Sequence, residues 1–405
     1  MIKTEVALAQ AQGTLGIVPE TAVAEISRLR SPEETSTALA DGVAAAGVPV
    51  PALVGLLRNQ LPAEAADWLH YGATSQDIID TAFCLCAGSA LDDLSLALSD
   101  LIGALQAMSE AHADTLMLAR TRGQLATPIT FGLRVAGWAQ PLVGLEGELD
   151  VVRRVALRIQ VGGASGSRSV FGDSAKDFTA RMALDLGLTA GPPWHTDRSG
   201  GRRLANWLGR IVAATGKIGR DVSILTRGEI AEVKLTDGGR SSTMPHKSNP
   251  VTAEALQSLV PVAVGYEAGL AAASVHAEER DGAHWPVEWA LMPQIFETTG
   301  AALAHALKLM GSMIVDADAM RAHATTNTSF LAEAAVFALA PSVGRVNASR
   351  IVSEALASGH PLDTVLDVHG DIDWSSALSD SGFTSPAARV AAEIFAQRNA
   401  DKGDA

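Results

Sequence analysis

The segment LANWLGRIVAATGKIGRDVSIL, residues 204–225, decides the fold class of this chain. Its large apolar residues return every three or four positions, which is the period of one face of an α-helix. They are Leu204, Trp207, Leu208, Ile211, Val212, Ile218, Val222 and Leu225. The stretch 201–235 contains no proline, so we expect one long amphipathic helix there.

Four more stretches on either side of this segment predict long helices. They cover residues 77–115, 128–160, 250–275 and 286–315. Pro128 would occupy the first turn of its helix. We expect Pro261, Pro286 and Pro293 to start or kink helices rather than to mark strands. Aromatic residues make up only 4% of the chain and alanine is abundant, which favours closely packed helices. The expected fold is all-α, with an elongated bundle of about five long helices.

Shorter helical patterns lie at both ends of the chain. The N-terminal ones cover 4–15, 19–30 and 33–47, and the C-terminal ones cover 316–324, 329–341, 347–357, 361–367 and 385–398. We therefore predict an N-terminal helical domain over 1–76, a central long-helix bundle over 77–315 and a small C-terminal helical domain over 316–405. Between the long helices we expect polar loops at 117–127, 161–173 and 236–250.

The composition limits the kinds of partner. The 31 basic and 45 acidic residues give a net charge of -14, which argues against nucleic acid or an anionic membrane as a partner. No apolar run reaches the roughly 18 residues needed to span a bilayer. The two cysteines, Cys84 and Cys86, suit a reduced cytoplasm rather than a disulfide. The histidines show no HxxxH or HExxH spacing, so we expect no metal and no cofactor.

The most informative loop is DGGRSSTMPHKSNP, residues 237–250. A serine hydroxyl becomes a useful base only where N–H dipoles and a cation stabilise its alkoxide, and this loop supplies both. Lys247 and Asn249 would hold the oxygens of a substrate carboxylate while it takes on extra negative charge. The alternative is a solvated glycine-rich connection.

Residues 241–250, SSTMPHKSNP, resemble the signature loop of the fumarase/aspartase superfamily, usually written GSSxMPxKxNP. The resemblance implies a three-domain, all-α fold of that type. It also implies that Ser241 is the general base, and that Lys247 and Asn249 stabilise the aci-carboxylate intermediate. Arg240 stands where the family has its leading glycine. Family members usually carry some tens of residues before the helix that opens this chain, so the N-terminal domain looks truncated.

Two further segments resemble the family in the expected order. Residues 69–81, LHYGATSQDIIDT, resemble the segment whose Thr-Ser pair binds a substrate carboxylate, which implies this role for Thr74 and Ser75. The family suggests substrate contact for His70, although a histidine at a helix start is as often structural. Residues 120–128, RTRGQLATP, resemble the RTHGQxATP segment, in which Gln124 would contact substrate.

Arg122 stands where adenylosuccinate and argininosuccinate lyases have a histidine that assists proton transfer to a nitrogen leaving group. An arginine stays protonated and cannot act as a general acid near neutral pH. A carboxylate needs no such acid, and a guanidinium suits it by bidentate hydrogen bonding. Arg122 therefore favours a reaction in which a carboxylate oxygen attacks or leaves. The alternative is that Arg122 simply pairs with Glu288, whose family equivalent partners the missing histidine.

Three other segments resemble the 3-carboxy-cis,cis-muconate cycloisomerases, which interconvert a tricarboxylate and its lactone in aromatic catabolism. They are the PWHTxR segment with His195 and Arg198, the GGASG loop over 162–166, and the WxxEW motif around Glu288. Arg198 and Arg240 would add positive charge for the substrate, or serve as structural arginines. The resemblance implies a homotetramer whose active sites take segments from three chains. The alternatives are an adenylosuccinate lyase-like enzyme that releases fumarate, and a non-catalytic homologue of the fold.

Overall fold

The computed structural model describes residues 1–33, 35–240, 243–244, 247–360, 362–369 and 372–400. It is 69% helical with a few short strands, which confirms the all-α prediction. The chain forms two compact units. Unit 1 contains residues 1–95, 148–210 and 262–299, and unit 2 contains residues 96–147, 211–261 and 300–405.

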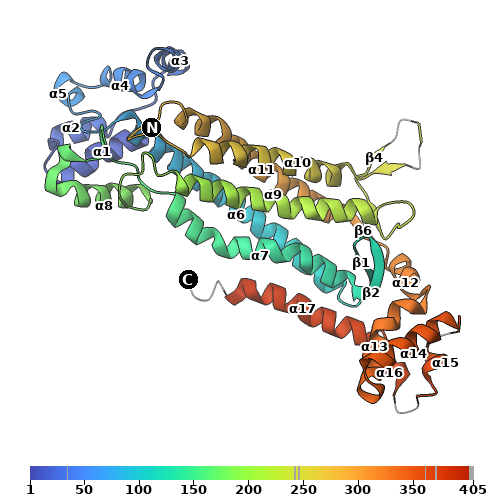
Figure 1. Cartoon of the computed structure of the whole chain (residues 1–405). Helices are drawn as coiled ribbons and strands as arrows, with labels where there is room; N and C mark the ends of the chain where they lie inside the picture. Colours follow the sequence, from blue (N-terminus) through green and yellow to red (C-terminus); the bar gives the residue numbers. More distant parts are fainter. Residues whose placement is uncertain (34, 241–242, 245–246, 361, 370–371, 401–405) are drawn as a thin grey trace. The chain divides into compact units, whose positions relative to one another are not determined.

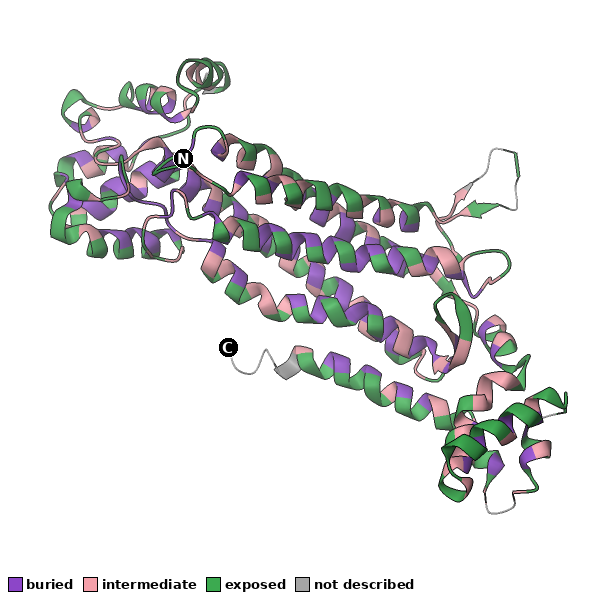
Figure 2. Cartoon of the chain, in the orientation of Figure 1, coloured by how far each residue is buried: buried purple, intermediate pink, exposed green. Residues whose placement is uncertain are grey.

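The five predicted long helices are present in the described part of the chain (Figure 1). They are α6 (Ser75–Ala111), α7 (Phe131–Ala156), α9 (Ser199–Leu225), α10 (Val251–Ala273) and α11 (Trp285–Ser312). Each helix buries an apolar stripe. Along α9, buried and exposed residues alternate, as Figure 2 shows. As predicted, the three prolines lie in helices: Pro286 is in the first turn of α11, while Pro261 and Pro293 lie inside α10 and α11.

The remaining helices of unit 1 are short. They are α1 (Ile2–Thr14), α2 (Glu20–Ile26), α3 (Thr35–Ala46), α4 (Val50–Arg58), α5 (Ala63–Ala66), the 3-10 helix η1 (Ser169–Ser174) and α8 (Ala175–Leu186). Leu8, Ile26, Leu53 and Phe178 belong to one buried cluster that joins α1, α2, α4 and α8. This core fixes the segments that lead into α6 and carry part of the candidate site.

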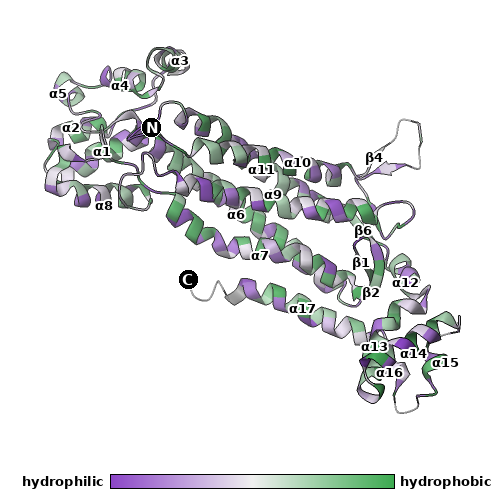
Figure 3. Ribbon diagram, viewed as in Figure 1, coloured by the Kyte–Doolittle hydropathy of each residue, from purple (hydrophilic) through white to green (hydrophobic). Residues whose placement is uncertain are grey.

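The remaining elements of unit 2 include the C-terminal helices. They are β1 (Leu116–Thr121), β2 (Gln124–Thr130), β3 (Val233–Leu235), β4 (Gly239–Arg240), β5 (Ser248–Asn249), β6 (Met313–Val315), α12 (Ala317–Thr325), η2 (Thr328–Leu331), α13 (Ala332–Val343), α14 (Arg345–Ala357), α15 (Leu362–Leu366), α16 (Trp374–Ala377) and α17 (Ser381–Ala400). Residues of α13 to α16 form an apolar cluster of their own, and these helices alternate hydrophobic and hydrophilic positions in Figure 3.

The expected loop at 117–127 is instead an antiparallel hairpin of β1 and β2, and Pro128 lies in β2 opposite Leu118. Each strand of a two-stranded ribbon has one unpaired edge, and proline is tolerated where its nitrogen faces that edge. Helix α7 therefore begins at Phe131 rather than at Pro128. The hydroxyl of Thr130 accepts a hydrogen bond from the N–H of Leu133 at 3.0 Å, which is the geometry of an N-cap.

The helices predicted over 201–235 and 286–315 end earlier than expected, and helix α8 lies where no helix was predicted. Helix α9 ends at Leu225, and β3 then pairs with β6, so α11 also ends earlier, at Ser312. Helix α8 (Ala175–Leu186) was missed. Its buried Phe178, Met182 and Leu186 recur every four residues, a pattern that would have indicated it.

Helix α6 corrects the expectation about membrane spans, because its length and apolar composition would allow it to cross a membrane. Its first turns nevertheless carry two buried carboxylates, Asp77 and Asp80. Both accept hydrogen bonds from other residues of unit 1. These contacts tie the start of α6 to the rest of unit 1.

Candidate active site

The predicted Thr-Ser pair lies at the start of α6. The Asp77 carboxylate accepts a hydrogen bond from the backbone N–H of Thr74 at 3.1 Å, which closes the first turn as in a capping box. Thr74 and Ser75 are half-buried, and they stand at the positive end of a 37-residue helix. A substrate carboxylate would be stabilised at such a helix end by its free N–H groups and hydroxyls.

Asp77 also ties the predicted GGASG loop to α6. Its carboxylate accepts hydrogen bonds from the N–H groups of Gly162 and Gly163, both at 2.9 Å, and from the side chain of Gln160 at 3.2 Å. His195, which is buried, places Nε2 3.1 Å from the same carboxylate. The structure therefore brings Thr74 and His195 together through Asp77.

Arg280 links the start of α6 to the GGASG loop. Its guanidinium donates to Oε1 of Gln76 at 3.2 Å and to the carbonyl of Ala164 at 3.0 Å. Gln76 in turn donates to the carbonyl of His195 at 2.9 Å. The loop, the histidine and the helix start are thus one hydrogen-bonded body. Arg280 lies in none of the segments that the sequence singles out, because its partners Gln76 and Ala164 lie far along the chain.

Gly162→Ala is expected to disturb this body. A Cβ at position 162 would lie 2.3 Å from Cε1 of His195, closer than real contacts allow. We expect a loss of about 1–3 kcal/mol of stability from this overpacking, seen as a lower thermal midpoint. Gly191→Ala is the matched control, because nothing lies within 4 Å of its Cβ position. Equal midpoints for the two variants would contradict the packing described.

Arg198 is enclosed by two carboxylates. It donates to Asp80 at 2.7 Å and to Glu288 at 2.9 Å, and its guanidinium lies 4.7 Å from the ring centre of Trp194. Burial acts to lower the pKa of Arg198, but Asp80 and Glu288 outweigh it and raise the pKa. Since its charge is already compensated, the geometry favours a structural arginine over a substrate cation. Among the described residues, Glu288 forms its hydrogen bonds with Arg198, and the His276 imidazole lies 3.7 Å away.

His276 borders this network, whereas His70 pairs with a residue of α1. His276 has a fully buried side chain, 3.7 Å from Glu288, and both ring nitrogens lack a hydrogen-bond partner among the described residues. Burial lowers the pKa of His276, and Arg198 lowers it further. His70 has a left-handed backbone, with φ of 66°, and its Nδ1 lies 2.7 Å from the buried carboxylate of Glu5. A structural role for His70 is supported by this pair.

Arg122 and Gln124 lie at the tip of the hairpin in unit 2. Arg122 and Gly123 form its two-residue turn, with φ of 53° and 82°, between the paired residues Thr121 and Gln124. Two positive φ values define a type I′ turn, which explains the glycine and places the arginine under backbone strain. Both Arg122 and Gln124 are exposed, so their side chains are available to a ligand.

The hairpin is anchored by a buried carboxylate. Arg120 donates two hydrogen bonds to Glu232, at 2.7 and 2.9 Å, and His323 binds the same group at 2.8 Å. Burial acts to raise the pKa of Glu232, but these hydrogen bonds outweigh it and lower the pKa below its ordinary value. The strained tip is therefore carried on a rigid base.

The predicted signature loop begins and ends in a short antiparallel pair. Strand β4 places Gly239 opposite Asn249 and Arg240 opposite Ser248. Arg240 thus occupies an extended strand, a conformation that does not require the family's glycine. Lys247 is exposed and Asn249 is half-buried. Ser241, the predicted base, lies outside the described residues.

Comparisons with known proteins agree with the motifs. Residues 33–265 match a protein family described as Lyase. The 3-carboxy-cis,cis-muconate cycloisomerase of Pseudomonas aeruginosa is 39% identical over 363 residues, covering 87% of this chain and 79% of that protein. The 3-carboxy-cis,cis-muconate cycloisomerase of Bradyrhizobium diazoefficiens is 36% identical over 364 residues, covering 88% of this chain and 81% of that protein.

A solved structure gives the same answer. The crystal structure of 3-carboxy-cis,cis-muconate lactonizing enzyme from Pseudomonas putida matches with a TM-score of 0.85 and 32% sequence identity. The match covers 99% of this chain and 94% of that one. Sequence motifs, family match and fold therefore agree that this chain belongs to the fumarase/aspartase superfamily of lyases.

Proposed function

We propose that this protein is a cycloisomerase that interconverts 3-carboxy-cis,cis-muconate and its carboxymuconolactone. The observation that carries the proposal is Arg122, a permanent cation at the exposed tip of an anchored hairpin, where amine-releasing relatives have a proton donor. Two relatives, 36% and 39% identical to this chain, are named 3-carboxy-cis,cis-muconate cycloisomerase. Their names support 3-carboxy-cis,cis-muconate as the substrate.

The proposed chemistry uses only protein side chains and water. One substrate carboxylate oxygen forms a C–O bond to the conjugated double bond, and the displaced electron pair moves into a second carboxylate. Lys247, Asn249 and the Thr74-Ser75 pair would hold that carboxylate, with Gln124 as a further contact. The adjacent carbon then takes a proton from the hydroxyl of Ser241, which is reprotonated from water. In lactone opening Ser241 removes the proton. Because the reacting groups belong to one molecule, orientation supplies much of the rate.

We also infer a cytoplasmic homotetramer with active sites shared between chains, and the domain division 1–76, 77–315 and 316–405. Exposed apolar side chains on the long helices support self-association, among them Leu96 on α6 and Val262 and Val264 on α10. Sedimentation in solution should give four times the chain mass of 42.0 kDa. A monomer would contradict shared sites.

An ultraviolet assay tests the activity. The absorbance of the conjugated diene of 3-carboxy-cis,cis-muconate should fall as the lactone forms. Release of fumarate from adenylosuccinate would support the lyase alternative instead. If the folded protein converts neither 3-carboxy-cis,cis-muconate nor adenylosuccinate, the non-catalytic alternative is supported.

Arg122→Gln is expected to lower kcat/KM for the tricarboxylate by about tenfold or more, because a charge-assisted bidentate contact is lost. Arg122→Lys should restore only part of the loss, since an ammonium cannot bind in two parallel contacts. Arg220→Gln, which removes an exposed arginine from α9, is the control. Unchanged kinetics in Arg122→Gln would show that the guanidinium does not contact substrate.

A further inference from the structure

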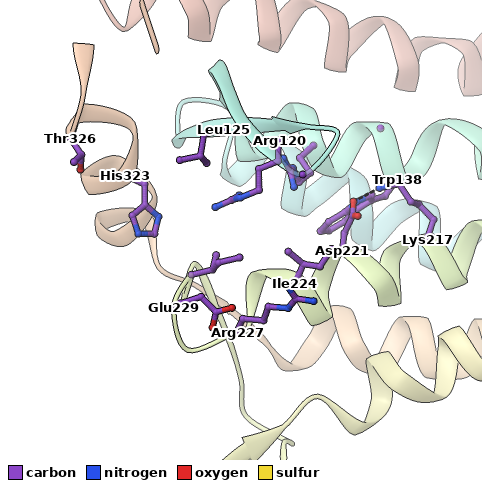
Figure 4. Close-up of a pocket in the computed structure, with 14 residues that line it drawn as sticks. Arg120, Leu125, Trp138, Lys217, Asp221, Ile224, Arg227, Glu229, His323 and Thr326 are labelled. Atoms are coloured by element: carbon purple, nitrogen blue, oxygen red, sulfur yellow. Dashed lines mark hydrogen bonds and ion pairs between the residues drawn. The ribbon is translucent and has the colours of Figure 1, made fainter. Parts of the chain in front are cut away.

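A pocket lies in unit 2, with a volume of about 780 Å³ (Figure 4). Its walls come from α7, α9, the loop that follows α9, the β1–β2 hairpin and α12. The hairpin contributes Gly123 and Leu125, whereas Arg122 and Gln124 are absent from the described lining. Successive residues of a strand point to opposite faces, so the pocket lies behind the face that carries Gln124.

The pocket is rich in cations. Arg120, Arg134, Lys217 and Arg227 line it, against the carboxylates Asp221 and Glu229. Two of these cations are already paired: Arg120 binds Glu232, and Lys217 binds Asp221. No ion pair is recorded for Arg134 or Arg227 among the described residues.

Arg134 is the unusual member of this set. It is half-buried on α7, and burial lowers the pKa of its guanidinium even though Asp221 acts in the opposite direction. A half-buried cation without a close counter-ion loses part of its hydration, and a bound anion would offset that cost. Figure 4 shows Arg120, Arg227 and His323 around the same opening.

The pocket also has an apolar part. Leu125, Ile224, Ile230 and Trp138 line the pocket, and the indole N–H of Trp138 is fixed by a hydrogen bond to Asp221 at 2.8 Å. Pockets of this size with apolar walls and a few convergent polar groups suit small organic ligands. A guanidinium fork matches a carboxylate or a phosphate by two parallel hydrogen bonds.

We propose that this pocket is a second ligand site, which binds a small organic polycarboxylate at Arg134 and Arg227. The ligand rests its carbon skeleton on Trp138 and Ile224. Because Gly123 and Leu125 form one wall, the bound anion orders the hairpin that carries Arg122. The proposal concerns binding alone, so it stands independently of the proposed lactonisation.

Citrate is a suitable probe, because it is a tricarboxylate without a conjugated diene. Calorimetric titration at low ionic strength should show citrate binding to the Lys247→Ala variant, in which the proposed catalytic cation is removed. Adding Arg134→Gln or Arg227→Ala to that variant should weaken this binding by about tenfold or more. Arg227 is exposed, so its replacement should keep the fold even where that of Arg134 does not. Arg220→Ala in the same background is the matched control on α9.

Hydrogen exchange locates the site. Citrate should slow amide exchange in residues 116–130 of the Lys247→Ala protein, and this protection should vanish with Arg227→Ala but not with Arg220→Ala. Absence of citrate binding to Lys247→Ala would overturn the proposal, as would equal affinities in the Arg227→Ala and Arg220→Ala proteins. Inorganic phosphate that binds as tightly, with the same dependence on Arg227, would overturn the assignment to an organic polycarboxylate.

Discussion

Ser241→Ala is expected to lower turnover of 3-carboxy-cis,cis-muconate by a factor of about 100 or more, with substrate binding largely kept. The reason is that the hydroxyl would act only in the proton-transfer step and not in holding the substrate. The carboxylates would still be held by Lys247, Asn249 and the start of α6. Steady-state kinetics by diene absorbance, together with a direct binding titration, measure the two effects separately.

Ser242→Ala is the matched control, since it removes a neighbouring hydroxyl from the same loop. It should retain much more turnover than Ser241→Ala. Wild-type turnover in Ser241→Ala would refute its role as the proton-transfer group. A loss of binding equal to the loss of rate would instead assign it to substrate capture.

Arg198→Met is expected to destabilise unit 1 by about 3–5 kcal/mol, because it leaves carboxylates buried without their cation. Asp80 is 2% exposed, and it would keep only the hydrogen bonds from Gln76 and the indole N–H of Trp285. The loss appears as a lower urea midpoint. Arg210→Met is the control, because the Arg210–Glu148 pair is about half exposed and should contribute about 1 kcal/mol or less.

Equal midpoints for Arg198→Met and Arg210→Met would contradict the compensated network. A folded Arg198→Met protein that lost only substrate affinity would restore the sequence-based interpretation of Arg198 as a substrate cation. The two outcomes are distinct, since stability and kinetics are measured on the same preparation.

The long helices were predictable because each has a continuous apolar stripe. The spacing of Leu204, Leu208 and Ile211, three or four residues apart, reveals this stripe from neighbouring residues alone. The β1–β2 hairpin was not predicted. Its two-residue turn has positive φ at both positions, and such turns usually have the sequence Asn-Gly. Here Arg122 stands in place of the asparagine, so the usual sequence signal is missing. Pro128 then pointed to a helix start three residues too early.

The candidate site was predictable only in part. Motif resemblance supplied Thr74, Arg122 and Glu288, because short-range spacing carries that information. The partners of Arg198 could not be predicted, since Asp80 lies 118 residues away and Glu288 lies 90 residues away along the chain. Pairings at such separations are set by tertiary packing and leave no local pattern.

Running the reaction in deuterium oxide, with NMR analysis of the product, tests whether Ser241 delivers the proton. The expected product is a lactone with one deuterium, on one face of the carbon next to the bound carboxylate, because a single hydroxyl delivers it. Recovery of unchanged muconate, or lactone with deuterium on both faces, would contradict proton delivery by a positioned serine.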